Sequence, residues 1–150
     1  MKSRTLVFFK PNMTMNDEVR SACNLFFSRV KIVEDYGLHQ MPIDFFKEFY
    51  KHVPEPDLTR HATFCSSGLI SIMILEGEDV IERVHQIIGS TNSSRASFHT
   101  LRGYFYHKYQ PENGYDNFAH SSESGQAFER ELALFLAHFS ASAQTVNGVL

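Results

Sequence analysis

Several polar side chains in this sequence stand at the ends of apolar segments, where a fold can bring them into one cleft. His120 ends a short apolar run, and Glu131 follows eleven residues later on a predicted helix. A neutral imidazole is a competent nucleophile toward phosphorus, and a carboxylate that holds its second nitrogen fixes the tautomer. The other members of this set are Lys10, Tyr50, Thr91, Arg102 and Asn117.

The two cations of this set suit the same chemistry. Lys10 and Arg102 would neutralise the charge that spreads over a phosphoryl group during transfer. A histidine at the end of a strand can face a cleft with a helix N-terminus, a natural anion site, directly behind it. None of these residues is specific when taken alone, but together they predict a site for phosphoryl transfer.

Composition limits how such a site can hold phosphate. The chain has 150 residues with 14 Lys and Arg against 17 Asp and Glu, which gives a formal net charge of −3. A mildly acidic chain is no general binder of polyanions, so any phosphate site must be local. Its 8 glycines form neither a G-x-G nor a G-x-x-x-x-G-K motif, which excludes Rossmann and Walker-type loops. Side chains would therefore have to hold the phosphates.

The elements that position these groups follow from hydrophobic patterning. Apolar and β-branched runs predict strands at 5–9, 30–38, 69–75 and 117–120. Helical periodicity predicts helices over 17–28, from Pro42 to about 50, up to about Cys65, and over 78–88. Ser121 or Ser122 is expected to cap a last helix. Periodicity fails between Gly89 and Asp116, which predicts a long functional or interface-forming loop.

The order of these elements predicts one α/β (α+β) sandwich. Strands that alternate with helices through short connections fit a ferredoxin-like βαββαβ antiparallel sheet with added helices. We expect the helices to cover one face of this sheet. The domain would span residues 1–139, and residues 140–150 would form a short C-terminal tail, either loose or docked on a neighbouring copy.

Cysteine content and targeting signals predict a cytoplasmic protein. Cys23 and Cys65 both lie among apolar residues, which is typical of buried free thiols. The first residues lack the apolar run of a signal peptide, and no apolar run reaches the ~20 residues that span a bilayer. We therefore expect no membrane association.

Ordered sequence blocks resemble the nucleoside diphosphate kinase family over residues 5–135. The segment TLVFFKP at 5–11 resembles the family's first strand and Lys-Pro turn, and NFAHSSES at 117–124 resembles its Asn-x-x-His-Gly-Ser-Asp-Ser signature. Further blocks follow in the family's order: SG at 67–68, LEG at 75–77, GSTN at 89–92, TLRG at 100–103 and ERELALF at 129–135.

The resemblance implies a role for each matching position. His120 would carry the γ-phosphoryl group as a phosphohistidine, passing it from a nucleoside triphosphate to a diphosphate by a ping-pong mechanism. Ser122 and Glu131 would orient His120, and Tyr50 would bind near the transferring phosphate. The nucleotide-binding set would be Lys10, Leu58, His85, Thr91, Arg102 and Asn117.

The resemblance also implies a cofactor and partners. Mg²⁺ would bind through the nucleotide phosphates without direct protein ligands, with Glu123 as a contact through water. The partners would be ATP, GTP and nucleoside diphosphates, with no stable nucleic-acid partner. A symmetric homo-oligomer, a hexamer of dimers or trimers, is expected. Oligomer size and nucleotide preference stay open.

Some positions depart from the family pattern. The phenylalanine that stacks on the base in the family falls near Asp57 and Leu58, so nucleotide affinity would be lower unless Leu58, His61 or Phe64 closes the gap. A phosphate-binding arginine aligns with His85, which offers less charge. The cluster Tyr104, Tyr106, Tyr109 and Tyr115 is interpreted as interface or loop packing.

Two other functions are possible for a chain with these residues. The departures at Leu58 and His85 allow a catalytically weakened nucleotide- or partner-binding member of the same fold. A ferredoxin-like domain that binds single-stranded nucleic acid would need a basic sheet with exposed aromatic residues, which this acidic chain lacks. The kinase is therefore the predicted function.

Overall fold

A four-stranded antiparallel sheet forms the centre of the structure. The computed structural model describes the backbone of residues 2–149 and the side chains of residues 2–141. The strands lie in the order β2-β3-β1-β4 and span β1 Lys2–Phe9, β2 Lys31–His39, β3 Ile70–Glu78 and β4 Ala119–Ser121. Helices connect them in the predicted βαββαβ sequence, which confirms the ferredoxin-like α+β class.

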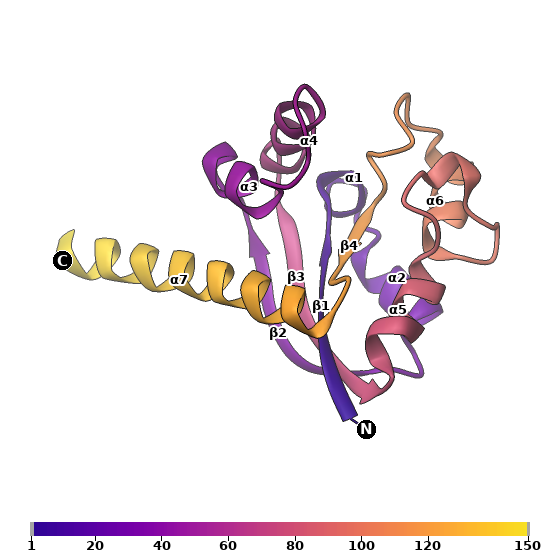
Figure 1. The fold of residues 1–150 in the computed structure, drawn as a ribbon, viewed down its shortest axis with the longest axis horizontal. Coiled ribbons are helices and arrows are strands. Elements are labelled where there is room, and N and C mark those ends of the chain that lie inside the picture. The colour runs from indigo at the N-terminus through magenta and orange to yellow at the C-terminus, as the bar shows by residue number, and fades with distance from the viewer. Residues whose placement is uncertain (1, 150) are drawn as a thin grey trace.

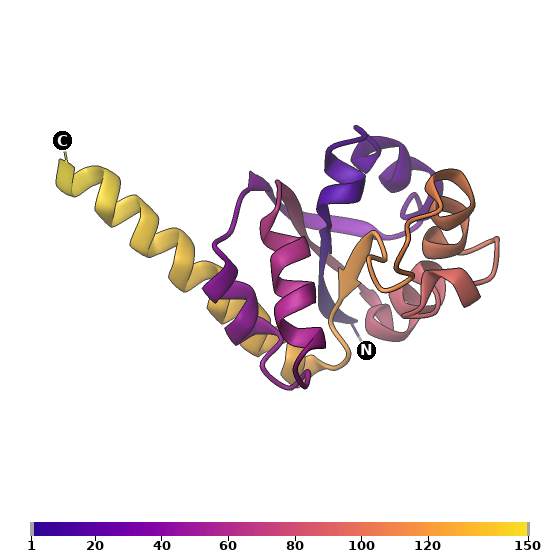
Figure 2. The same ribbon diagram turned by 90° about the horizontal axis from the view of Figure 1, so that it is seen from above.

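Helices cover both faces of this sheet, so the prediction of one covered face is wrong. Figures 1 and 2 show α2 (Val19–Phe26), α5 (Val80–Ile88) and α6 (Leu101–Tyr109) on one side. On the other side lie α3 (Ile43–Phe49), α4 (Asp57–Ser66) and α7 (Gly125–Val149). Two short elements, α1 (Pro11–Thr14) and the 3₁₀ turn η1 (Ser93–Arg95), complete the described elements.

The central strands explain why both faces are covered. Successive side chains of a strand point to opposite faces, and β1 is apolar at every position from Leu6 to Phe9. Val7 and Phe9 pack into the core beneath α2, α5 and α6, whereas Leu6 and Phe8 pack beneath α3, α4 and α7. A strand that is buried on both faces reads as a continuous apolar run, which is the pattern of residues 5–9.

The segment from Gly89 to Asp116 is ordered and contains η1 and α6, which the absence of apolar periodicity concealed. The Thr100 hydroxyl accepts the amide proton of Gly103 and caps α6. A Cβ on Gly103 would lie 2.0 Å from the carbonyl oxygen of Ser97, so only glycine lets the helix approach the preceding turn.

The last helix differs in two ways from its prediction. Its cap is Ser124, whose hydroxyl accepts the amide proton of Ala127, and not Ser121 or Ser122. The backbone continues α7 to Val149 and extends away from the sheet in Figure 1. Residues 140–149 therefore prolong a helix, whereas their composition predicts a short tail that is loose or docked on a neighbouring copy, and Leu150 lies outside the described residues.

The described part of the chain bears on two further expectations. Both cysteines are free, and Cys65 is buried as predicted whereas Cys23 is half-buried. Burial raises the pKa of the Cys65 thiol to about 11, so the thiol stays protonated at neutral pH. Across residues 2–149 no helix combines the length and apolar character that crossing a bilayer requires.

Replacing Phe8 by alanine is expected to lower the free energy of unfolding by about 3–5 kcal/mol, because large-to-small changes in a closed core leave a cavity. The Phe8 ring is fully buried, and its centroid lies 5.9, 5.7 and 6.0 Å from those of Phe46, Phe49 and Phe135. Urea unfolding at one fixed protein concentration measures the change.

The matched control for this prediction is Phe98→Ala, because Phe98 is 57% exposed. An exposed ring should contribute no more than about 0.5 kcal/mol. Equal losses in the two variants would contradict the assignment of Phe8 to the core.

Candidate functional site

A cavity of about 760 Å³ opens beside the C-terminal end of β1. Its walls come from Lys10 directly after β1, from α3, α4, α5, α6, β4 and α7, and from the loop that precedes β4. Of the predicted site residues, those that line it are Lys10, Tyr50, His85, Thr91, Arg102, Asn117, His120, Glu123 and Glu131. Residues far apart in the sequence thus meet in one hollow.

His120 is held rigidly in the middle of β4. It pairs in register with Phe8 of β1, and its ring stacks on the Phe8 ring with 5.0 Å between centroids. Its Nε2 lies 3.1 Å from Glu131 Oε1, which also accepts a 2.7 Å hydrogen bond from the Ser122 hydroxyl. Only 13% of the His120 side chain is exposed, and the exposed part faces the cavity.

The hydrogen bonds around His120 determine its tautomer. The Glu131 carboxylate accepts a hydrogen bond from Nε2–H, which leaves the lone pair on Nδ1. The Tyr50 hydroxyl lies 3.3 Å from Nδ1, and burial raises the pKa of this phenol well above its ordinary value, so the hydroxyl is a donor. The nitrogen that faces Tyr50 and the cavity is therefore the one with a lone pair.

Burial and the Glu131 carboxylate act in opposite directions on the pKa of His120. Burial dominates and lowers it below the ordinary value of 6.5, although the hydrogen bond from Nε2 to Glu131 raises it in part. Burial alone would raise the pKa of Glu131. The hydrogen bonds from His120 and Ser122 have the larger effect and lower it below its ordinary value. At neutral pH the pair is therefore a neutral imidazole bonded to a carboxylate.

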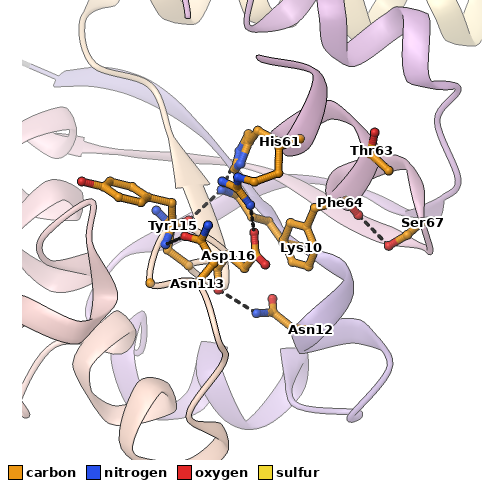
Figure 3. A network of polar contacts seen from close by, with 12 residues as sticks. Lys10, Asn12, His61, Thr63, Phe64, Ser67, Asn113, Tyr115 and Asp116 are labelled. Atoms are coloured by element: carbon orange, nitrogen blue, oxygen red, sulfur yellow. Dashed lines mark hydrogen bonds and ion pairs between the residues drawn. The ribbon is translucent and has the colours of Figure 1, made fainter. Parts of the chain in front are cut away.

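Lys10 lies where β1 ends, with its amide donating to the Phe118 carbonyl at 2.8 Å. Its ammonium donates to Asn117 Oδ1 at 2.6 Å and lies 3.1 Å from His61 Nε2 (Figure 3). An ammonium has three hydrogens, so one remains for a ligand. Burial lowers the pKa of Lys10 to about 8, with a further decrease from Arg102, and the group is still mostly cationic at pH 7.

His61 serves Lys10 as a neutral acceptor. Burial, followed by the charge of Lys10, lowers the pKa of His61 to about 2. The Nε2 lone pair is therefore available to the ammonium, and the ring proton resides on Nδ1. His61 comes from α4, which places a helix residue against the end of β1.

Arg102 and Asn117 fix the backbone around the cavity. Arg102 donates to the carbonyls of Gly89, Asn117 and Ala119 at 2.9, 3.2 and 2.7 Å. The Asn117 amide donates to the carbonyl of Thr91 at 2.6 Å. Burial lowers the pKa of Arg102 to about 10, so the guanidinium stays charged at neutral pH. It lies in the first turn of α6 and not in a loop as predicted.

Phe118 has a positive φ of 76°, which is unusual for a bulky residue. This turn of the backbone separates Asn117, which contacts Lys10, from His120. Its strain is offset by the surrounding contacts, because the Phe118 side chain is fully buried and its carbonyl accepts from Lys10.

Two predicted residues lie elsewhere. Leu58 is not among the lining residues and packs against the apolar cluster of α3, α4 and α7, while its neighbour Asp57 lines the cavity. Ser122 is buried beneath the site and reaches it only through Glu131. Arg83, two positions before His85 in α5, donates to the carbonyls of Glu78 and Arg29 and does not line the cavity.

Four residues line the cavity that the sequence pattern does not place in the site, namely two arginines, one histidine and one tyrosine. Arg60 and Arg130 line the cavity, as do His61 and Tyr115. Arg60 donates to Asp116 at 2.7 Å and joins α4 to the loop before β4, where Figure 3 shows Asp116 beside Asn113 and Tyr115. These contacts span more than fifty positions, and no local pattern marks them.

A divalent cation bound through nucleotide phosphates fits this donor set better than a cation caged by protein. Among the described residues no group of three or more His, Cys, Asp or Glu could hold a metal ion. Of the carboxylates in the cavity, Glu131 is bonded to His120 and Ser122, whereas Glu123 and Asp57 are exposed. Mg²⁺ keeps several waters and needs few protein ligands, and an exposed carboxylate such as Glu123 is a group that can contact it through water.

Comparison with known proteins gives the same description over nearly the whole chain. The family model described as "Nucleoside diphosphate kinase" matches residues 3–141. The curated nucleoside diphosphate kinase of Methanosphaera stadtmanae is 31% identical over 137 residues, covering 90% of this chain and 86% of that protein. That of Methanocaldococcus jannaschii is 29% identical over 136 residues, covering 90% and 94%.

Solved structures share the fold. The nucleoside diphosphate kinase of Aquifex aeolicus superposes with a TM-score of 0.79 at 26% identity, covering 90% of this chain and 95% of that chain. The halophilic nucleoside diphosphate kinase of Halobacterium salinarum, solved in complex with CDP, gives a TM-score of 0.75 at 28% identity, covering 90% and 88%.

Proposed function

The chain belongs to the nucleoside diphosphate kinase family, a family of phosphotransferases, and we propose that it moves the γ-phosphoryl group of a nucleoside triphosphate to a nucleoside diphosphate through a phosphohistidine at His120. One observation carries this proposal. His120 Nε2 is bonded to Glu131, so the lone pair on Nδ1 faces a cavity that Lys10 and Arg102 also line.

The proposed transfer has two displacements at the same nitrogen. In the first, Nδ1 of His120 forms a bond to the γ-phosphorus as the bond to the β,γ-bridging oxygen breaks, and the diphosphate leaves. In the second, an oxygen of another diphosphate attacks the phosphorus, and the electron pair of the N–P bond returns to Nδ1. The proton stays on Nε2 and is hydrogen-bonded to Glu131, whose negative charge stabilises the positive charge of the phosphorylated ring.

The remaining residues of the cavity would hold the phosphates and ribose. Lys10 offers its third ammonium hydrogen to the γ-phosphate, and Tyr50 borders the phosphoryl group on Nδ1. Arg102, Thr91 and His85 would contact the β- and γ-phosphates, and Asn117 the ribose. One site that serves donor and acceptor in turn implies little discrimination between bases.

The proposal includes a cofactor, an assembly and a location. Mg²⁺ would supply charge neutralisation of the phosphates when nucleotide is bound, with Glu123 placed to contact its waters. A symmetric homo-oligomer, a hexamer, is the proposed assembly, and the cytoplasm the proposed location. All proposed catalytic groups lie in or directly beneath one cavity, so the catalytically weakened alternative is not favoured.

A labelling experiment with the wild-type protein tests the mechanism. The protein is incubated with Mg²⁺ and γ-labelled ATP, freed of nucleotide, and then exposed to acid, to base, or to unlabelled GDP or CDP. We expect a label that is lost in acid, stable in base and transferred to either diphosphate. A protein that takes no label, or carries an acid-stable label typical of phosphoserine, would overturn the proposal.

His85→Arg is expected to lower the KM for nucleoside diphosphates by about tenfold, because a guanidinium adds a full charge and a two-pronged donor to the phosphates. His85 lines the cavity from α5 and is half-buried. Steady-state kinetics at pH 7 with ADP and CDP measures the change.

Gln86→Arg is the matched control, since it adds the same charge at an exposed neighbour that does not line the cavity. If His85→Arg leaves the KM unchanged, then His85 does not face the phosphates. If both variants lower it equally, the effect comes from net charge alone.

A further inference from the structure

An exposed aromatic ring borders the cavity at the loop before β4. Tyr115 lines the cavity and is 48% exposed. A half-exposed tyrosine in a binding hollow keeps one side of its ring in water until a ligand covers it. Among the described residues, no other ring lies within stacking or edge contact of Tyr115.

The other tyrosines of the same segment have partners, so they do not share this property. Tyr104 and Tyr106 pack against the core beneath α6. The Tyr109 ring stacks near Phe105, and its hydroxyl donates to Glu18 at 2.9 Å. Three members of the tyrosine cluster therefore pack against the core from α6, and Tyr115 does not.

The backbone that carries Tyr115 is fixed on both sides. The Tyr115 amide donates to Asn113 Oδ1 at 2.8 Å, and the carbonyl of Gly114 accepts from the amide and hydroxyl of Ser93 at 2.9 and 2.8 Å. Asp116 accepts from Arg60 at 2.7 Å, and its carbonyl accepts from Asn12 at 2.8 Å (Figure 3). These hydrogen bonds hold the backbone on both sides of Tyr115 and so position its ring.

The residues expected to replace the missing phenylalanine are engaged elsewhere. Leu58 and Phe64 pack against the apolar cluster of α3, α4 and α7. His61 is buried and bonded to Lys10. Phe49 and Tyr50 also line the cavity, but they are almost wholly buried and surround His120. Tyr115 is therefore the exposed phenyl ring that a planar group in this cavity can cover.

We propose that Tyr115 is the residue that stacks on the nucleobase, from the β4 side of the cavity, in place of an aromatic residue on α4. This inference rests on the proposed function. Phosphates would occupy the inner end with Lys10 and His120, which leaves the base near Tyr115 and Arg60. Stacking suits every base because each has a π-face, so this contact gives affinity without selecting among bases.

Kinetic variants measure the contribution of the ring. Tyr115→Ala should raise the KM for ADP and CDP by roughly 5- to 100-fold, while kcat changes less than about threefold. Tyr115→Phe keeps the ring and should restore the wild-type KM. The control Phe98→Ala removes an exposed ring outside the cavity and should leave both constants unchanged.

A second experiment reports binding without turnover. The chain contains no tryptophan, so Tyr115→Trp introduces a single fluorophore at the proposed contact. ADP and CDP should each quench its emission with saturation, whereas inorganic pyrophosphate, which has no base, should not. The wild-type protein in the labelling experiment serves as the reference for phosphoryl transfer.

The outcomes separate this inference from the proposed function. An unchanged KM in Tyr115→Ala, or equal quenching by pyrophosphate and ADP, overturns the stacking role even if the protein takes the phosphohistidine label. Saturable quenching by ADP and CDP but not pyrophosphate supports the stacking role even if the wild-type protein takes no label. Absence of quenching by either nucleotide overturns the role.

Discussion

Replacing His120 by alanine is expected to abolish the acid-labile label and to reduce kcat/KM by at least about 10⁴-fold. The covalent route needs a nucleophilic nitrogen, and loss of a nucleophile removes that route entirely. Ser122 is not placed to take over, because it is buried and its hydroxyl donates to Glu131. Labelling with γ-labelled ATP and coupled steady-state assays measure both effects.

The control for this variant is His99→Ala, which removes an exposed histidine outside the cavity. It should label and turn over like the wild type. Circular dichroism checks that His120→Ala is folded, since the ring it loses stacks on Phe8. Equal labelling of the alanine variant and the wild type would show that His120 is not the nucleophile.

Lys10→Met is expected to reduce kcat/KM by about 10²–10³-fold at pH 7, the usual effect of removing one preorganised group that stabilises charge in the transition state. Methionine keeps most of the length of the lysine side chain and removes the ammonium that bonds to Asn117 and His61. The control Lys51→Met removes an exposed lysine paired with Glu48 and should leave kcat/KM unchanged.

The same variant has a signature in the pH profile. Burial lowers the pKa of Lys10 to about 8, so the cation is present below pH 8 and is lost as the pH rises through that value. Wild-type kcat/KM should therefore fall on the alkaline side of pH 8, and Lys10→Met should lack this decline. The acidic decline of the wild-type kcat/KM should lie below pH 6.5, because burial lowers the pKa of His120. An alkaline decline that persists in Lys10→Met would assign it to another group.

The strands could be predicted from the sequence because their signal is local and strong. The runs at 5–9 and 69–75 are apolar throughout, and they form the two central strands. The order of elements led to the wrong prediction of one covered face, because it does not determine the side on which a helix packs. That information lies in the alternation of Leu6 and Phe8 with Val7 and Phe9, which both cores need.

Helix α6 escaped prediction for a physical reason. Its buried residues are Leu101, Gly103 and Phe105, whose spacing of two is not that of an apolar helical face. One of the three is a glycine, which contributes backbone proximity to Ser97 and no apolar surface. Tertiary contacts therefore specify this helix more than its own pattern does.

The candidate site shows the same division between local and distant information. His120, Asn117 and Glu131 lie within fifteen residues, and a short motif could predict their proximity. His61 contacts Lys10 across 51 positions, and Arg60 contacts Asp116 across 56. Such pairs depend on how α4 packs against the end of β1, which neither composition nor periodicity encodes.

The pairing of β1 with β4 has a consequence for how this fold can vary. His120 is opposite Phe8 and Lys10 is bonded to Phe118, so nucleophile and cation are carried by one two-stranded ribbon. Their separation therefore depends first on the pairing of β1 with β4 and less on how the surrounding helices pack. The walls of the cavity on α4, on α5 and in the loop before β4 lie outside this pairing and can diverge, at positions such as Asp57, His85 and Tyr115. Substitutions in these walls can therefore change how a ligand is bound while His120 and Lys10 stay in place.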